Sequence, residues 1–339
     1  MKKALWGLGG AAVILVILAF LLGRFAFPYD GVLSLPAPEV AEGQRGELGI
    51  DKSVNEATID QYLGRSDAVY VDLRMLKDPG DYEAIGGDSY LSGFVDGFEV
   101  VPFPYIVNVS GLPEAVGQTY TGATLFTEKD GVYSANYAES MAILESLFPK
   151  DKTIFLICGG GGYAGMMKKM LVTLGWDGSK IYVVGGYWFY EGEHNVPVKR
   201  TAANGETVYD FYKVPYHEID FDALTPVTDG LANMSAVAYD KMAKEGQSFL
   251  VFIDQGGCHT ADRLREFIKR YNGETGRVFY KIMFSDAKET GLAESVKYYP
   301  SVAVVRDGKV TAWLRADEEE DSDEYNDYEA FKAWMKQYI

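Results

Sequence analysis

The chain contains two cysteines, and each stands where a thiol can react. Cys158 directly follows the apolar run TIFLI, and four glycines come after it before a helical pattern begins near Ala164. Such a run is costly in backbone entropy, but it permits a tight loop whose N–H groups converge on one sulfur. With the N-terminus of the next helix, this cradle favours a thiolate or a bound anion. A buried structural cysteine beside a flexible turn is the alternative interpretation.

Cys258 lies within FLVFIDQGGCHTADRL, where a buried strand pattern gives way to a helical one. A thiol at the N-terminal end of a helix has a lowered pKa. His259 either polarises this thiol or is an ordinary exposed histidine at the start of the helix. The sequence therefore predicts a second thiol centre at the junction of a strand and a helix.

Strand and helix patterns alternate along the chain, which predicts βαβ units and a mostly parallel sheet. In the first half, strands are expected at 67–73, 106–109, 153–157 and 181–184, and helices at 137–148 and 165–174. Asn204-Gly205 then indicates a hairpin. After Thr225-Pro226 the pattern starts afresh, with helices expected at 237–244, 261–271 and 328–338 and strands at 249–253, 278–284, 301–305 and 309–314. The fold class is therefore α/β, with a domain boundary near 218–230.

Four short segments of the first half occur in a characteristic order. They are VYVDLR with Asp72 and Arg74, FPYIVNV at 103–109, the six-residue loop Cys158–Tyr163, and the turn Gly185-Gly186-Tyr187-Trp188. In combination they resemble the rhodanese domain, a sulfurtransferase fold in which a loop cysteine carries a persulfide. The resemblance covers residues 59–190 and implies an open parallel sheet with flanking helices.

This resemblance implies roles for individual residues. Cys158 would be the catalytic residue, supported by Asp72, Arg74 and Trp188. The anion or persulfide cradle would consist of Gly159, Gly160, Gly161, Gly162, Tyr163 and Ala164. The family's loop commonly ends in arginine, whereas this loop ends in tyrosine. Loss of that guanidinium removes an anion clamp worth about 1–3 kcal/mol, so weaker use of thiosulfate is expected.

Residues 248–339 resemble the thioredoxin fold, through Cys258 at its strand–helix junction and through Tyr299-Pro300-Ser301-Val302 followed by AVVRDGKV. The resemblance implies a cis Pro300 that faces Cys258. The resolving cysteine of the family is replaced by Ala261, so a dithiol cycle within this domain is excluded. Monothiol chemistry remains, or a thioredoxin fold retained as a binding module.

The N-terminus carries a membrane signal. Lys2 and Lys3 precede an uncharged apolar run at 4–22, which is closed by Arg24. As a helix the run is about 28 Å long, close to the thickness of the hydrocarbon core. The exit from the run is a poor cleavage site, so an uncleaved signal anchor at 1–27 is expected; a cleaved signal peptide and a buried core helix are the alternatives. The lysines favour a cytoplasmic N-terminus with all later residues extracytoplasmic.

Length, charge and histidine content limit the remaining possibilities. A chain of 339 residues suits an anchor, a tether at 28–49, a rhodanese-like domain with a hairpin extension at 50–217, and a thioredoxin-like domain at 225–339. A formal net charge of -17 argues against nucleic acid as a partner. The three histidines, His194, His217 and His259, lie far apart in sequence, so neither a metal nor another cofactor is expected.

Three functional hypotheses follow. The first is a membrane-anchored extracytoplasmic sulfurtransferase or thiol-redox protein, in which Cys158 carries a persulfide that is passed on, in one version through Cys258. Its partners would be a small sulfur donor and a thiol or protein disulfide. The second is a catalytically degenerate binding module at the cell envelope. The third is a disulfide between the two cysteines, serving as a staple or a redox sensor.

Overall fold

The computed structural model describes residues 33–77, 92–109, 122–255, 259–315 and 321–339. The anchor expected at 1–27 lies outside these residues. Within the described ranges, no helix combines the length and the apolar character needed to cross a membrane. The α/β class, with a parallel sheet and flanking helices, is confirmed.

The first sheet has the strand order β3-β1-β7-β8 and is parallel throughout. Its strands are β1 (Ala68–Asp72), β3 (Glu99–Val100), β7 (Thr153–Cys158) and β8 (Ile181–Gly186). Helices α4 (Ser140–Leu147) and α5 (Gly162–Thr173) share a hydrophobic core with one face, and the turn η2 (Ile59–Tyr62) shares one with the other. Because both faces are covered, the strands are continuously apolar, as in TIFLI.

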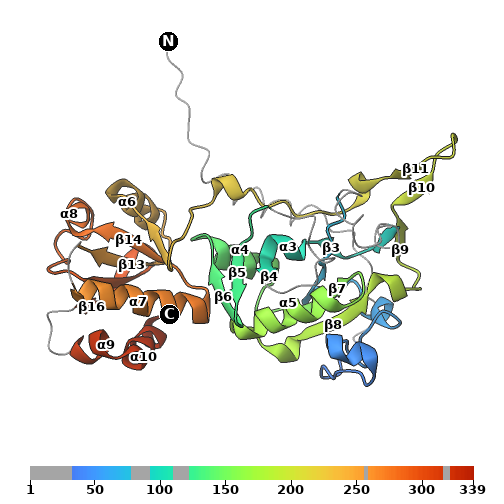
Figure 1. Cartoon of the computed structure of the whole chain (residues 1–339), viewed down its shortest axis with the longest axis horizontal. Helices are drawn as coiled ribbons and strands as arrows, with labels where there is room; N and C mark the ends of the chain where they lie inside the picture. The colour runs from blue at the N-terminus through green and yellow to red at the C-terminus, as the bar shows by residue number, and fades with distance from the viewer. Residues whose placement is uncertain (1–32, 78–91, 110–121, 256–258, 316–320) are drawn as a thin grey trace, which may run out of the picture.

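Smaller elements surround this sheet (Figure 1). A three-stranded sheet has the order β4-β5-β6, and β2 pairs with β9. The hairpin expected at Asn204-Gly205 is confirmed, with Gly205 at φ 85°, and it projects from the body of the molecule. The elements are η1 (Gln44–Leu48), β2 (Gly93–Val95), α3 (Phe103–Ile106), β4 (Val107–Val109), β5 (Phe126–Lys129), β6 (Val132–Ala135), η4 (Gly178–Lys180), η5 (Tyr187–Phe189), β9 (Asn195–Pro197), β10 (Lys199–Thr201), β11 (Thr207–Tyr209), η6 (Phe211–Lys213) and η7 (Phe221–Ala223).

The second sheet has five strands in the order β12-β14-β13-β15-β16. β13 is central, parallel to β14 and antiparallel to β15. Alternate residues of its strands join two separate cores, one shared with α7 and α10 and the other with α6 and α8. The elements are β12 (Leu231–Asn233), α6 (Ala236–Lys244), β13 (Phe249–Asp254), α7 (His259–Thr275), β14 (Phe279–Met283), α8 (Phe284–Ala287), β15 (Ser301–Arg306), β16 (Lys309–Arg315), α9 (Ser322–Asn326) and α10 (Tyr328–Tyr338).

The junction between the two sheets is packed. The Glu139 carboxylate accepts hydrogen bonds from the Thr225 backbone N–H at 2.9 Å and from its hydroxyl at 2.8 Å. The C-terminal end of α7 meets β6, where a Cβ atom on Gly273 would lie 2.8 Å from a methyl carbon of Val132. Figure 1 shows α7 reaching towards β6 from the second sheet. The chain between the sheets is therefore held against the first core.

The described part of the expected tether, residues 33–49, also packs on the first sheet. The Tyr182 hydroxyl donates to the Pro36 carbonyl at 2.5 Å, and the Arg65 guanidinium donates to the Leu33 carbonyl at 2.9 Å. Leu35 and Leu48 pack against the two cores of the sheet. These leucines cover apolar surface, which explains why the segment folds onto the sheet although it has no clear hydrophobic period.

Candidate functional site

Cys158 is the last residue of β7, at the carboxyl edge of the first sheet. It is a free thiol, and only 3% of its surface is exposed. The chain then turns sharply into α5 through Gly161, which has a φ of 108° and caps the helix. This left-handed conformation is strained for a residue with a side chain, so a glycine is required there. The strand end and the helix start together fix the position of the sulfur.

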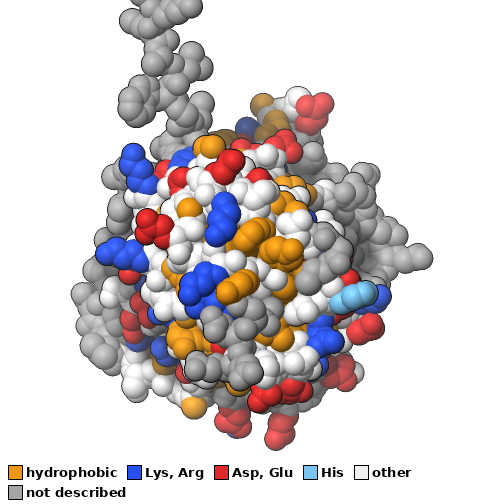
Figure 2. All heavy atoms as spheres, turned by 90° about the vertical axis from the view of Figure 1, so that its left-hand side faces the viewer, with side chains coloured by type: hydrophobic (Ala, Val, Ile, Leu, Met, Phe, Trp, Pro, Cys, Tyr) orange, Lys and Arg blue, Asp and Glu red, His pale blue; other side chains and the backbone are white. Residues whose placement is uncertain are grey.

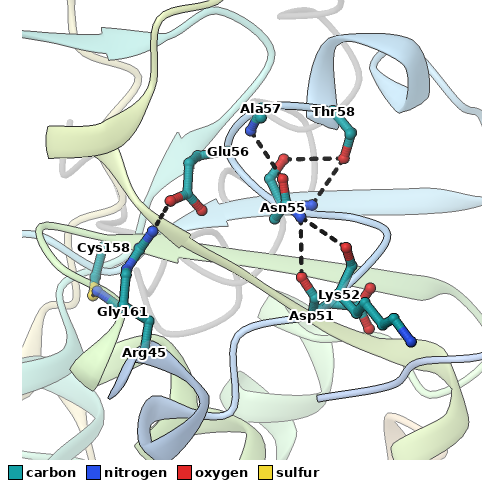
Figure 3. A network of polar contacts seen from close by, with 9 residues as sticks. All are labelled: Arg45, Asp51, Lys52, Asn55, Glu56, Ala57, Thr58, Cys158 and Gly161. Carbon is teal, nitrogen blue, oxygen red and sulfur yellow. Dashed lines mark hydrogen bonds and ion pairs between the residues drawn. The ribbon is translucent and has the colours of Figure 1, made fainter. Parts of the chain in front are cut away.

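Three backbone amides of the Cys158 loop (residues 158–164) surround the sulfur. The Gly161 N–H donates to Sγ at 3.1 Å, and the backbone amides of Ala164 and Tyr163 also act to lower the pKa of the thiol. Figure 3 shows Gly161 directed at the thiol. These amides come from the third glycine of the run and from the first turn of α5.

Burial nevertheless dominates the electrostatics of the thiol. Desolvation is the largest influence and raises the pKa of Cys158 above its ordinary value. The three amides act in the opposite direction, while the negative charge of Asp72 adds to the rise. The expectation that the cradle favours a thiolate is therefore wrong for the resting site, because removal of water outweighs the amides. The resting site holds a protonated thiol in a cradle suited to an anion.

Asp72 and Arg74 form a buried ion pair beside Cys158. Both side chains are 1% exposed, and the Arg74 Nε donates to both carboxylate oxygens at 3.0 Å. The guanidinium also donates to the Gly93 carbonyl and lies 4.1 Å from the centre of the Tyr187 ring. Asp72 pairs with Ile157 in the sheet. The pair thus lies beside the strand end that carries the sulfur.

The aromatic residues of the loop region have different surroundings. The Trp188 ring lies over Gly160, where a Cβ atom would be 3.0 Å from Cζ3, and the backbone N–H of Trp188 donates to the Gly159 carbonyl at 3.2 Å. Trp188 is 40% exposed, so it forms a partly open wall over the loop. Tyr163 instead stacks on the buried Phe103 with ring centres 4.7 Å apart, which makes its ring part of the core.

A segment that sequence reasoning did not select lies against the same loop. A Cβ atom on Gly161 would lie 3.0 Å from Cδ1 of Ile50, and one on Gly165 would clash with the Leu48 carbonyl oxygen. Arg45, on the same segment, pairs with Glu56 (Figure 3). No local signal marked these residues, because they come from a stretch without a clear hydrophobic period and contact the loop only after folding.

The second thiol centre is described in part, since Cys258 lies outside the described residues. The expected cis Pro300 is confirmed. It is buried, and the next residue, Ser301, pairs with Ile253 near the carboxyl end of β13. His259 begins α7 with a fully exposed side chain. Ala261 is fully buried in the core.

Helix α7 separates the region around His259 and Pro300 from the junction with the first sheet. Gly273 contacts β6, whereas His259 is the first residue of the helix. At 1.5 Å per residue, the path from His259 to Gly273 is about 21 Å long. Figure 2 looks onto the end of the molecule that carries the second sheet. The beginning of α7 therefore lies well away from the packed junction.

No protein-family model matches the chain, and no curated protein matches it. Solved structures give weak similarity to thioredoxins over about a third of the chain. A mutant thioredoxin from Halobacterium salinarum NRC-1 is 16% identical, with 34% of this chain and 95% of that one covered and a TM-score of 0.27. The oxidised thioredoxin from Plasmodium falciparum is 18% identical, with 31% and 95% covered and a TM-score of 0.26.

Proposed function

We propose that the protein is a membrane-anchored, extracytoplasmic thiol enzyme in which Cys158 accepts and donates sulfane sulfur. The single observation that carries this proposal is the set of backbone amides around Sγ of Cys158, with Gly161 N–H at 3.1 Å. Such amides stabilise a thiolate or a persulfide anion without a side-chain cation. The rhodanese-like order of motifs around the loop supports the same chemistry, and the apolar N-terminal run supports the anchor.

The proposed cycle needs no oxidant. The Cys158 thiol loses its proton to solvent, and the thiolate attacks the terminal sulfur of a persulfide donor. The donor's S–S bond breaks, the donor leaves as a thiolate, and Cys158 holds the persulfide. An acceptor thiolate then attacks the outer sulfur, so that the acceptor becomes the persulfide and Cys158 returns as a thiolate. The amides of Gly161, Tyr163 and Ala164 stabilise each anionic state of the residue.

Persulfides of small thiols suit this site better than thiosulfate. The loop offers amide donors and no guanidinium of its own, because position 163 is a tyrosine stacked on Phe103. A dianion such as thiosulfate would lose more solvation on entering a buried site than a singly charged persulfide would. The acceptor is a small thiol or a protein thiol.

Intact-mass measurement tests the proposal directly. The reduced protein is incubated with a small-molecule persulfide, and wild type is expected to gain one sulfur atom that a thiol acceptor removes. Cys158→Ser should gain none at this position, whereas Cys258→Ser should behave as wild type. Loading of the Cys158→Ser variant at the same level as wild type would refute the assignment of Cys158.

A second candidate function is a binding module without turnover. It is favoured by the raised pKa of the Cys158 thiol and by the buried Ala261 at the position of a resolving cysteine. Exposed apolar side chains near Pro300 suit a protein partner: Tyr299 is 43% exposed, and its ring centre lies 5.0 Å from that of Phe284. This function predicts no sulfur loading with any donor.

A further inference from the structure

Residues 45–50, called here the cover segment, form a lid over the Cys158 loop. Leu48 lies against the start of α5, since its Cδ1 would lie 3.5 Å from a Cβ atom on the cap residue Gly161 and its carbonyl oxygen would clash with one on Gly165. Ile50 packs against Gly161 from the same side. Ile50 belongs to the core cluster that includes Cys158, and the partly buried Leu48 packs against that cluster. The cover segment therefore contributes to the burial of the thiol.

An ion pair holds the cover segment at its start. The Arg45 guanidinium pairs with the Glu56 carboxylate and lies 3.9 Å from the centre of the Phe189 ring. Glu56 is 7% exposed, and its Oε2 lies so close to Gly185 that a Cβ atom there would clash with it. Gly185 has a φ of 119° and pairs with Ile157, the residue before Cys158. Glu56 and Phe189 thus anchor Arg45 close to the loop, and Figure 3 shows the contact between Arg45 and Glu56.

The pair is incompletely satisfied. Nε and Nη2 of Arg45 and Oε2 of Glu56 are buried and have no hydrogen-bond partner among the described residues. Water would hydrogen-bond to all three atoms if the pair opened. The ion pair therefore stabilises the closed state less than a fully hydrogen-bonded pair would. An ion pair with this property suits a contact that opens during function.

We propose that Arg45 is a positioning residue that, with Glu56, latches the cover segment over Cys158 and thereby sets the exposure of the thiol. The inference deepens the proposed function, since it identifies how Cys158 becomes reactive. Lifting the segment lets water reach Sγ while the amides of Gly161, Tyr163 and Ala164 stay in place. The closed state protects the sulfur, and the open state presents it to donor and acceptor.

The groups that face the thiol make the effect of opening predictable. From the end of β1 it meets the charge of Asp72, which is paired with Arg74. From α5 it meets the backbone amide of Tyr163, while Arg45 at the start of the cover segment is paired with Glu56. Asp72 and Arg74 stay paired when the cover lifts, so the main change is loss of desolvation, which favours the thiolate.

The test is the rate at which iodoacetamide alkylates Cys158 across a range of pH. Arg45→Met and Glu56→Gln are each expected to raise the rate at neutral pH roughly tenfold, as a fall of about one unit in the thiol pKa would. The pH midpoint of alkylation should move down in both variants. Arg45→Lys should restore most of the wild-type protection. The control is Lys52→Met. Lys52 lies just after the cover segment and forms an exposed ion pair with Glu39, so its replacement should leave the alkylation rate unchanged.

The outcomes separate the latch from the proposed function. Near-ultraviolet circular dichroism checks that each variant is folded. Unchanged alkylation in folded Arg45→Met and Glu56→Gln would overturn the latch, even if wild type carries sulfur on Cys158. Faster alkylation in both, with no sulfur loading of wild type from a persulfide donor, would support the latch and reject sulfur transfer. Equal acceleration in Lys52→Met would mean that loss of any nearby charge loosens the segment, which also overturns the latch.

Discussion

Gly161 donates its backbone N–H to Sγ of Cys158 across 3.1 Å, and the same glycine lies beneath the side chain of Ile50. One residue therefore both stabilises an anion at the sulfur and forms part of the packing that keeps water from it. The raised pKa of the thiol shows that exclusion of water is the larger effect in the closed arrangement. The reactivity of Cys158 thus depends on the access of water to its sulfur as much as on the backbone amides around it.

Replacing Gly161 should damage the loop in a way that replacing Gly162 does not. Gly161→Ala forces a side chain into a φ of 108° and brings its Cβ to 3.0 Å from Ile50. We expect a loss of about 1–2 kcal/mol in the free energy of unfolding, from the left-handed conformation alone, and impaired sulfur loading. Gly162→Ala is the matched control, because a Cβ there meets nothing within 4 Å. Urea unfolding measures both variants, and equal stability would contradict the structure of the turn.

The pH dependence of stability should carry the signature of a buried thiol. The folded protein keeps the Cys158 proton at pH values where the unfolded chain has already lost it. Stability therefore falls as pH rises from the unfolded pKa, about 8.5, towards the raised folded pKa. Cys158→Ala has no thiol at this position, so its free energy of unfolding does not fall in this way. The variant should therefore be less stable than wild type by a smaller amount at about pH 10 than at about pH 7. Urea titrations at both pH values test this. A difference in the free energy of unfolding that is the same at both pH values would exclude a raised pKa for Cys158.

Breaking the buried pair beside the thiol should be far more damaging than breaking a surface pair. Arg74→Met leaves the Asp72 carboxylate buried without its cation, since both side chains are 1% exposed. The expected cost is about 3–5 kcal/mol in the free energy of unfolding. Lys241→Met, which removes the cation of the exposed pair between Lys241 of α6 and the C-cap residue Glu245, should change stability little. Thermal unfolding compares the two, and similar small losses would show that the buried pair is replaceable.

Cys158 should gain and release sulfur without help from Cys258. Gly273 of α7 packs against β6, so the helix keeps His259 about 21 Å from that contact. Cys258→Ser is therefore expected to leave the rate at which Cys158 gains sulfur unchanged, and likewise the rate at which a small thiol removes it. Time-resolved intact mass provides both rates. A slower release in Cys258→Ser would demonstrate a relay and would require the two parts of the chain to rearrange.

Local sequence patterns determined much of this molecule. The alternation of apolar runs and helical spacing located β1, β7, β8 and β13 to within about two residues. Asn204-Gly205 marked its hairpin, and the four glycines after Cys158 marked the loop in which the Gly161 amide meets the sulfur. These features follow from the conformational preferences of neighbouring residues, which are written in short stretches of chain.

Tertiary structure alone decided how buried the thiol is. Leu48 and Ile50 are more than 100 residues away from Gly161 in the chain, so no local period connects them, yet they close the Cys158 loop. The same holds for Arg45 over Phe189 and for α7 against β6. Desolvation depends on every atom that surrounds a group, whatever its position in the sequence. The residues around Cys158 could therefore predict its amide donors, while the sign of its pKa shift emerged only when distant segments packed over it.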